Sequence, residues 1–568
     1  MYTKQKAIKE VVAGLKQVLG KGYDLSVEAI ETPKSTEHGD LAFPCFQVAK
    51  ESDKNPAEMA ATIAQEFSKT EFIKSAEAMG PYVNFRFDEK GFAKSVIDDV
   101  MQEGTAYGHS DLGKSKRVIV DFANLNTHKE FHIGHVRNAV LGQSIIRTLH
   151  ANGFDVIGAA YIGDVGTHVA KALWGYKKFQ NDEEIPKALR AKRLGELYTQ
   201  ANTYITEHEE AKDDVAKVLQ QLEAGEEPWR ALWKKTRKWS LDELKVIFAE
   251  LGVVPDAWYF ESEVEKPGKE IVQRLLTDGI AIKSEGATII DLEDEDLGAF
   301  LILKSDGSSL YATKDLALAQ KKQDDYAADR QIFVVDNRQS LYFKQLFSAL
   351  RKTGMHTQFT HIAYDFVTLP DGAMSSRKGN IVLTREVIDE MTDSLVKETQ
   401  KRHEDWKDEK TRETAHTIAI AALNFMMLRQ DPNSIITFDK KEALSFEGFT
   451  GPYILYTLAR ISSLQRKTKI KPLLAPEKLK HPLERAILAK IADYPSVVIQ
   501  AGASYQISSI AAWVYEAAKL FAEYYGQARI VDEAHKEMTA SRLALAGALA
   551  QAMQNALGLL GIRSVDEM

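Results

Sequence analysis

The sequence contains one cysteine, Cys45, among 568 residues. A single thiol cannot form a disulfide within the chain, and it cannot supply a zinc site built on several cysteines. Such sparse cysteine usage is typical of a reducing compartment. We therefore expect a cytoplasmic protein without structural zinc or another resident metal.

Long apolar runs are also missing. No segment approaches the roughly 18 consecutive apolar residues that a membrane-spanning helix requires. The first ten residues lack the apolar core of a secretory signal, and Glu10 together with the lack of arginine argues against a transit peptide. We expect no membrane partner.

Positive charge is not in excess, since the formal net charge is −8. A local basic surface can still bind RNA, so net charge neither predicts nor excludes a nucleic-acid partner. Hydrophobic residues at 44% and charged residues at 27% are ordinary for a globular protein. The length predicts about two to four domains.

Residues 1–112 are predicted to form a small α/β domain. Residues 56–67 begin with proline and carry apolar side chains four apart, which favours a helix. Residues 82–87 alternate as a half-buried strand does. The polar residues 108–116 are a plausible linker to the next domain.

Residues 113–410 show a strand, helix and strand in sequence. We predict strands at 117–122 and 155–162, joined by a helix that follows Gly134 and continues to about Ala151. This order implies a parallel pair with a right-handed crossover, and such sheets bind ligands beyond the carboxyl ends of their strands. Residues from about 180 to 295 are helical and charge-rich, which indicates an insertion. Parallel strand signals resume at residues 299–303, 331–335 and 361–367.

Residues 411–568 have almost no strand signal. Long helical patterns over 411–429 and 507–525 predict an all-α domain.

Two histidines and a glycine, His132-Ile-Gly-His135, stand where the first strand and its loop meet the helix. Free backbone N–H groups and the helix dipole favour an anion there, and Gly134 allows close approach to the backbone. Triphosphate is the natural candidate. Two alternatives remain at this point: a metal pair at i, i+3 spacing, or surface histidines without a role.

A second candidate segment is 372–380, Gly-Ala-Met-Ser-Ser-Arg-Lys-Gly-Asn. Its hydroxyls, cations and small residues could clamp phosphates. Taken alone, the same composition also matches a solvated basic turn.

Together, these motifs resemble the class I aminoacyl-tRNA synthetases, which carry a HIGH motif and a KMSKS-like loop on a Rossmann sheet. The more detailed similarity is to the arginyl-tRNA synthetase family, and it extends over nearly the whole chain in the family's order. The similar segments are 38–42, 121–137, 162–167, 310–317, 334–339, 374–379, 451–460 and 559–563.

The resemblance implies a Rossmann-type parallel-sheet catalytic domain over 113–410 with its helical insertion at about 180–295. It also implies an N-terminal tRNA-binding additional domain over 1–112 and an all-α anticodon-binding domain over 411–568. The implied reaction is the activation of L-arginine with Mg-ATP to arginyl-adenylate, followed by transfer to the 3′ end of tRNA(Arg). Activation would require bound tRNA. The expected partners are tRNA(Arg), arginine and ATP, without a tightly bound cofactor, and we expect a monomer.

Arginine recognition requires carboxylates, because a guanidinium group pairs with them through two parallel hydrogen bonds. Asp121 and Asp315 are acidic residues of separate motifs at one sheet edge, and Tyr311 lies one helical turn before Asp315. The resemblance implies that arginine is contacted by Asp121, Asn124, Asn126, Tyr311, Asp315 and Gln339. The alternative for each, taken singly, is a helix cap or a turn residue.

For catalysis, the resemblance implies that His132 and His135 line the triphosphate while Lys129 and Arg377 balance transition-state charge. The second loop, Ala373-Met-Ser-Ser-Arg377, lacks both lysines of the general motif. Lys129 occupies the place of a compensating lysine in the family, and Lys378 is the alternative. The remaining residues expected to bind ATP are Gly134, Met374, Ser375, Ser376 and Lys378.

Binding of tRNA is expected at Tyr453, Tyr456 and Arg460, which share one helical face and could stack on unpaired bases. Met568 is a further candidate near the anticodon loop. The alternative for the two tyrosines is a place in the core. Rival functions are a non-catalytic tRNA-binding paralogue and a synthetase for lysine or glutamate.

Overall fold

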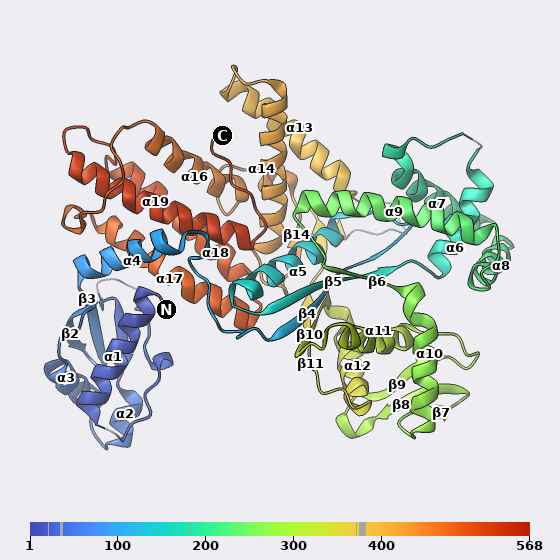
Figure 1. The fold of residues 1–568 in the computed structure, drawn as a ribbon, viewed down its shortest axis with the longest axis horizontal. Coiled ribbons are helices and arrows are strands. Elements are labelled where there is room, and N and C mark those ends of the chain that lie inside the picture. The colour runs from blue at the N-terminus through green and yellow to red at the C-terminus, as the bar shows by residue number, and fades with distance from the viewer. Residues whose placement is uncertain (21, 34–37, 182, 371, 374–381) are drawn as a thin grey trace.

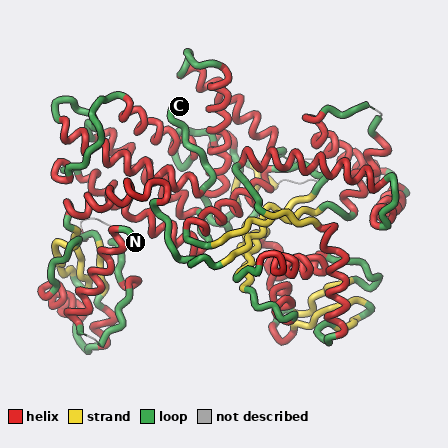
Figure 2. Tube along the Cα trace, in the orientation of Figure 1, coloured by secondary structure: helices red, strands yellow, loops and turns green. Residues whose placement is uncertain are grey.

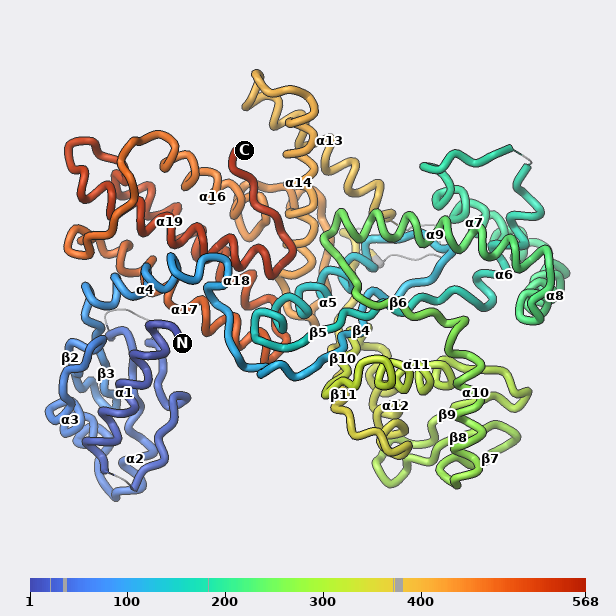
Figure 3. Tube along the Cα trace, viewed as in Figure 1, coloured from blue at the N-terminus to red at the C-terminus, as the bar shows by residue number. Residues whose placement is uncertain are grey.

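The computed structural model describes residues 1–568 except 21, 34–37, 182, 371 and 374–381. A central sheet lies between two groups of helices, and two smaller α/β units lie at opposite ends of the molecule (Figure 1). The N-terminal unit sits beside the C-terminal helices, so the first and last parts of the chain are neighbours (Figure 3).

The N-terminal unit is an antiparallel sheet in the order β1-β3-β2, with helices packed on it. The predicted helix at 56–67 and the predicted strand at 82–87 are both confirmed. Asn55 caps the helix through its side chain, and Pro56 fills the first position, where no N–H is needed. The elements are α1 (Thr3–Leu19), β1 (Leu41–Pro44), α2 (Phe46–Glu51), α3 (Pro56–Glu66), β2 (Ile73–Met79), β3 (Tyr82–Phe87) and α4 (Glu89–Glu103).

The central sheet is parallel, in the order β11-β10-β4-β5-β6. The predicted strand–helix–strand unit is confirmed as β4, α5 and β5, and the predicted strand over 331–335 is β10, paired with β4. The elements are β4 (Arg117–Asn126), α5 (Ile133–Ala151), β5 (Asp155–Gly163), β6 (Ala257–Phe260), β10 (Arg330–Asp336) and β11 (Gln358–Tyr364).

The two faces of this sheet have different coverings. Val118, Val120 and Phe122 of β4 belong to the core cluster that contains α5. The alternating residue Ile119 packs instead with residues of α10 (Glu261–Thr277) and α11 (Tyr311–Tyr326). Because strand side chains alternate between faces, Asp121 points to the α10–α11 side.

Two strand predictions are wrong. Residues 299–303 were expected in the parallel sheet, but β9 (Gly298–Leu303) pairs antiparallel with β8 (Ala287–Leu292) in a separate three-stranded sheet. Leu301 lies on the exposed face of β9. Because this exposed residue is apolar too, the sequence of the segment looks like that of a strand buried on both faces. Conversely, β6, β7 (Ile282–Ser284) and β8 all lie in the stretch expected to be helical, and β6, with four residues, is too short to show a period.

The rest of residues 113–410 is mostly helical. Helices α6–α9 form the group at the upper right of Figure 1, and α10–α12 pack with β7–β9 at the lower right. The remaining elements are α6 (Thr167–Phe179), α7 (Arg190–Glu207), α8 (Ala211–Glu223), α9 (Trp229–Leu251), β7 (Ile282–Ser284), α12 (Ser340–Lys352), β12 (Val367–Leu369), β13 (Gly372–Ala373) and α13 (Thr384–Arg402).

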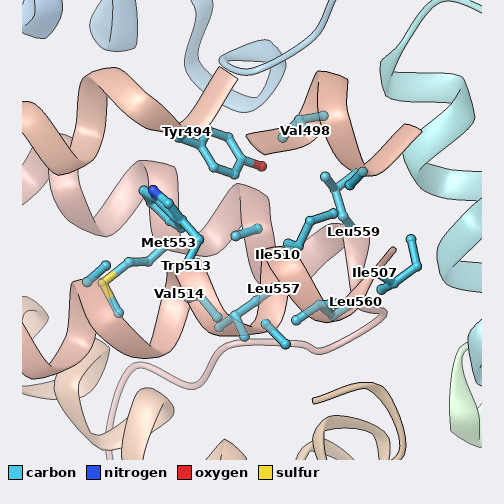
Figure 4. Packing of buried hydrophobic residues seen from close by; sticks show 14 of the residues in the cluster. Tyr494, Val498, Ile507, Ile510, Trp513, Val514, Met553, Leu557, Leu559 and Leu560 are labelled. Atoms are coloured by element: carbon cyan, nitrogen blue, oxygen red, sulfur yellow. The ribbon is translucent and has the colours of Figure 1, made fainter. Parts of the chain in front are cut away.

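The C-terminal part is a helical domain, and Figure 2 shows helices joined by loops over α16–α19. The two predicted long helices are confirmed as α14 and α18. Tyr494, Trp513, Met553 and Leu557 meet in its core (Figure 4). The elements are α14 (Asp408–Leu428), β14 (Ile436–Thr437), α15 (Lys440–Ala443), α16 (Gly451–Arg466), α17 (Pro482–Ser504), α18 (Ser508–Gln527) and α19 (Lys536–Leu559). No helix in the described part of the chain has both the length and the apolar character needed to cross a bilayer.

Helix α5 is fixed to both neighbouring parts of the molecule. Arg137, only 1% exposed, donates hydrogen bonds to the backbone carbonyls of Ser434, Asp431 and Pro432 at 2.7, 3.1 and 2.8 Å. Asn138 donates to the carbonyl of Val334 in β10 at 2.7 Å. The start of α5 is therefore held rigidly against the sheet and the helical domain.

Candidate active site

His128 fixes the loop between β4 and α5 to helix α9. Its Nε2 lies 2.8 Å from Thr236 Oγ1 of α9, and its backbone N–H donates to Ser240 Oγ at 3.0 Å. His128 has φ +62°, a left-handed conformation that needs this support. Burial lowers the pKa of His128 to about 3, so it stays neutral. The result is a fixed position for the next residue, Lys129.

His132 and His135 stack at the start of α5 with ring centroids 3.6 Å apart. Burial and the nearby charge of Lys129 lower the pKa of His132 to about 4, and burial lowers the pKa of His135 well below its usual range. Both rings are therefore neutral at pH 7. His135 Nδ1 accepts the N–H of His132 at 3.2 Å, which leaves the His135 proton on Nε2.

The geometry of His132 and His135 differs from both alternatives given above, a metal-binding pair and surface histidines without a role. The rings are half-buried and stacked, unlike free surface side chains. Within the described residues, no group of three or more His, Cys, Asp or Glu is placed to hold a metal ion. The pair instead offers neutral N–H donors beside Gly134 and the free N–H groups of the first helical turn.

Lys129 borders a pocket of about 420 Å³ between the first loop, α7, α9 and the start of α13. It forms no ion pair with any described residue, and its Nζ lies 5.8 Å from the ring centroid of Tyr198. Its charge contributes to the lowered pKa values of His132, His135 and His168. Lys129 is thus a cation available to the start of α5.

The second loop is brought to the first by backbone hydrogen bonds. Ile133 N–H donates to Val382 O at 3.1 Å, and Thr384 N–H donates to Phe131 O at 3.0 Å. These bonds hold the chain just after residue 381 against the start of α5. The predicted residues Met374, Ser375, Ser376, Arg377 and Lys378 lie outside the described residues.

Asp121, predicted to contact arginine, is buried on the α11 side of the sheet. Lys322 of α11 donates a hydrogen bond to its Oδ2, and both side chains are almost fully enclosed. Its Oδ1 is buried without a hydrogen-bond partner among the described residues. Lys322 therefore balances the charge of Asp121 through Oδ2, and Oδ1 remains available to accept a hydrogen bond.

A second buried carboxylate, Glu261, stands at the start of α10. Lys314 donates to Glu261 Oε1 at 2.6 Å. Gly163 lies between Glu261 and Asn126, because a Cβ there would come within 2.2 Å of Asn126 Oδ1 and 3.3 Å of Glu261 Oε2. Asn124 Oδ1 accepts the N–H of Tyr161 at 3.4 Å. Both predicted asparagines thus lie at the carboxyl end of β5.

Asp315 differs from these two carboxylates because no described cation forms an ion pair with it. The hydroxyl of Tyr342, from α12, donates to its Oδ2. Burial raises the pKa of Asp315 to about 6, with the charges of Asp121 and Glu261 adding to the effect. The three residues Asp121, Glu261 and Asp315 are called the acidic cluster below. Asp315 is not a helix cap, since α11 begins at Tyr311 with Leu310 as its cap.

The structure separates the other predicted arginine contacts from the cluster's interior. Tyr311 is 76% exposed, and Gln339 is also exposed, just before α12. Glu261, Lys322 and Tyr342 were not predicted from the sequence. Glu261 is 53 positions from Lys314, Lys322 is 201 positions from Asp121, and Tyr342 is in a different helix from Asp315. No local sequence pattern could identify partners so far apart.

The predicted tRNA-binding residues lie on the partly exposed face of α16. Arg460 donates to the hydroxyl of Tyr456 at 3.0 Å and lies over the rings of Tyr456 and Tyr525 at 4.8 and 4.7 Å. Tyr453 packs against Tyr515 at 5.8 Å and is partly buried. Met568 is half-buried against the core of the helical domain.

Comparison with known proteins supports the interpretation of these features. A family model described as tRNA synthetases class I (R), catalytic domain, matches residues 96–439. The parallel sheet, with histidines at the start of α5, and this match define a class I aminoacyl-tRNA synthetase. Two further models match: Arginyl tRNA synthetase N terminal domain over residues 4–87, and DALR anticodon binding domain over residues 454–568.

Whole-chain relatives identify the family. An arginine–tRNA ligase of Bdellovibrio bacteriovorus is 37% identical over 575 residues, covering 98% of each chain. Another, of Clostridium perfringens, is 34% identical over 544 residues, covering 95% of this chain and 96% of the relative. The chain belongs to the arginyl-tRNA synthetase family, as the sequence motifs predicted.

Solved structures confirm the predicted fold class. The arginyl-tRNA synthetase of Thermus thermophilus superposes with a TM-score of 0.83 at 24% identity, covering 99% of this chain and all of that one. The Plasmodium falciparum structure gives 0.81 at 19% identity over both full chains.

Proposed function

We propose that this enzyme binds L-arginine at the acidic cluster and activates it with Mg-ATP at the start of α5. The arginyl group then passes to the 3′ end of tRNA(Arg), and AMP and pyrophosphate are released. The proposed arginine contacts are Asp121, Asn124, Asn126, Tyr311, Asp315 and Gln339. Of these, Asp315 is assigned the central role.

The charge balance of the acidic cluster carries this proposal. Its three carboxylates face two lysines, Lys314 and Lys322, and each lysine pairs with a different carboxylate. One negative charge is left, on Asp315, which matches the single positive charge of a guanidinium group. Lysine would match the charge too, but the unpaired Oδ1 of Asp121 supplies a second acceptor suited to a planar group with several N–H donors.

The reaction needs no nucleophile from the protein. The arginine carboxylate attacks the α-phosphorus of ATP and pyrophosphate leaves. A terminal ribose hydroxyl of tRNA then attacks the carbonyl carbon, and AMP leaves. Positioning and charge stabilisation are what the protein supplies. His132 and His135 would donate neutral N–H groups to the phosphates, and Lys129 would supply positive charge.

The remaining assignments rest on sequence. Arg377 and Lys378 are proposed as further cations, and Met374, Ser375 and Ser376 as ATP contacts beside Gly134. Residues 1–112 and 411–568 are proposed to bind tRNA around the catalytic domain of 113–410. The single cysteine supports a cytoplasmic location. A monomer is proposed, and light scattering coupled to size exclusion would test it.

Pyrophosphate exchange tests the function directly. With tRNA present, we expect exchange with arginine, and at least about 10⁴-fold less with lysine, because a site built to hydrogen-bond one group rejects an analogue that leaves its acceptors unpaired. Each amino acid is assayed with and without tRNA. Exchange supported by lysine but not arginine would refute the assignment, and no exchange with any amino acid would favour a non-catalytic paralogue.

The face of α16 yields a separate prediction. Tyr456→Ala should raise the KM for tRNA about tenfold or more, because stacking on an aromatic ring contributes roughly 1–3 kcal/mol per base. The kcat at saturating tRNA should change little. Tyr456→Phe keeps the ring and is expected to keep the wild-type KM. A wild-type KM in Tyr456→Ala, with an unchanged melting temperature, would assign this tyrosine to packing alone.

A further inference from the structure

Tyr161 lies at the carboxyl end of β5, two residues before Gly163. Its strand neighbour Ala159 pairs in register with Asp121 of β4, so Tyr161 shares the α10–α11 face of the sheet with Asp121. On its other side, Tyr161 pairs in register with Tyr259 of β6. This position brings a tyrosine ring to the acidic cluster.

The hydroxyl of Tyr161 is buried and has no hydrogen-bond partner among the described residues. Two nearby tyrosines differ in this respect. Tyr259 donates to Asp325 at 3.0 Å, and Tyr342 donates to Asp315. A buried hydroxyl without a partner is costly, so such a group in a binding site points to a ligand atom that completes it.

Four carboxylates act electrostatically on this hydroxyl. After burial, the charges of Asp315, Glu261, Asp121 and Asp164 raise the pKa of Tyr161, in that order of effect. Asp164 is already paired with Arg237 at 2.7 Å, and Asp121 and Glu261 with their lysines. The phenol therefore stays protonated, in a part of the site where negative charge gathers.

We propose that Tyr161 contacts the substrate, with its hydroxyl oxygen accepting an N–H of the arginine guanidinium group. This rests on the proposed function, in which Asp315 receives that group. A guanidinium has five N–H donors and a single carboxylate accepts two of them in the parallel arrangement, so a further acceptor in the same site is required. Tyr161 and Oδ1 of Asp121 supply two acceptors without adding net charge.

The variant Tyr161→Phe tests this role because it removes one oxygen and keeps the ring. We expect the KM for arginine to rise about tenfold, the size expected for a lost hydrogen bond to a charged group, while kcat and the KM for ATP stay within about twofold. In the arginine-free protein, the melting temperature should stay the same or rise, because a buried hydroxyl without a partner is lost.

Tyr259→Phe is the matched control. It lies in register on the next strand, but its hydroxyl already has a protein partner. We expect it to lower the melting temperature and leave the KM for arginine unchanged. The proposal is overturned if Tyr161→Phe leaves the KM unchanged, or if it raises the KM only together with a lower melting temperature.

Asp315→Asn separates this proposal from the one on which it rests. If Asp315→Asn binds arginine as wild type does in calorimetry, the acidic cluster is not the arginine site and both proposals fail. If Asp315→Asn loses binding while Tyr161→Phe keeps it in full, only the role of Tyr161 fails.

Discussion

Replacing Asp315 with asparagine is expected to lower kcat/KM for arginine by about 10² to 10³-fold. The amide keeps the shape of the side chain and can still accept from Tyr342. The remaining charges, two carboxylates against two lysines, would then sum to zero and leave nothing to balance a guanidinium. Removing one partner of a buried charge pair costs about 2–5 kcal/mol, which sets this range. Steady-state aminoacylation at varied arginine measures the change.

The pH dependence of the same variant provides the control. The pKa of Asp315 is raised to about 6, and guanidinium binding requires its charged form. Bound arginine therefore lowers this pKa, and affinity is full above pH 6 and falls as Asp315 gains a proton below it. The wild-type KM for arginine should rise up to tenfold per unit below pH 6. In Asp315→Asn it should stay flat, and equal slopes in both proteins would contradict the assignment.

The local part of the site could be predicted from sequence because its signals are contiguous. A buried strand, a polar loop and a helix start adjoin one another around His132, and the structure reproduces that order as β4 and α5. Because adjacent parallel strands end at one edge of a sheet, the ends of β4 and β5 are expected to lie side by side. The close approach of Asn126 to Gly163 agrees with this expectation.

The charge balance of the acidic cluster could not be predicted. Asp121 alone suggests a free carboxylate, yet Lys322 neutralises it from 201 positions away. Helical periodicity relates residues three or four apart, and it contains no information on which lysine of α11 faces which strand. That choice follows from the packing of α10 and α11 on the sheet. Tyr161 was not predicted either, because the lack of a hydrogen-bond partner for its buried hydroxyl can be seen only in the folded structure.

The strand errors have a different cause. Residues 299–303 are apolar on both faces, and a fully apolar run is typical of a buried parallel strand. In β9 only Phe300 and Ile302 are buried, while Leu301 stays exposed in a small antiparallel sheet. Whether both faces of such a strand are buried depends on the tertiary structure, and the five apolar residues alone do not determine it.

In the proposed ATP site at the start of α5, positive charge has to come from a residue other than the two histidines. His132 and His135 are both neutral at pH 7, because burial and Lys129 lower their pKa values. Neutral imidazoles can donate hydrogen bonds but add no net charge. Lys129 is held by the loop that His128 fixes and has no ion-pair partner among the described residues, so its charge is available for the proposed contact with the phosphates.

Lys129→Ala is accordingly expected to lower the rate of arginine-dependent pyrophosphate exchange by about 10² to 10³-fold, the usual cost of losing one preorganised charge-stabilising group. The KM for arginine should change little, because the proposed role of Lys129 is at the phosphates and not at the arginine side chain. Lys129→Arg should recover part of the rate by restoring the charge. Lys192→Ala, which removes another lysine that lines the same pocket, is the matched control and should keep wild-type exchange. Full exchange in Lys129→Ala would transfer the role to Lys378, and Lys378→Ala would then show the large loss instead.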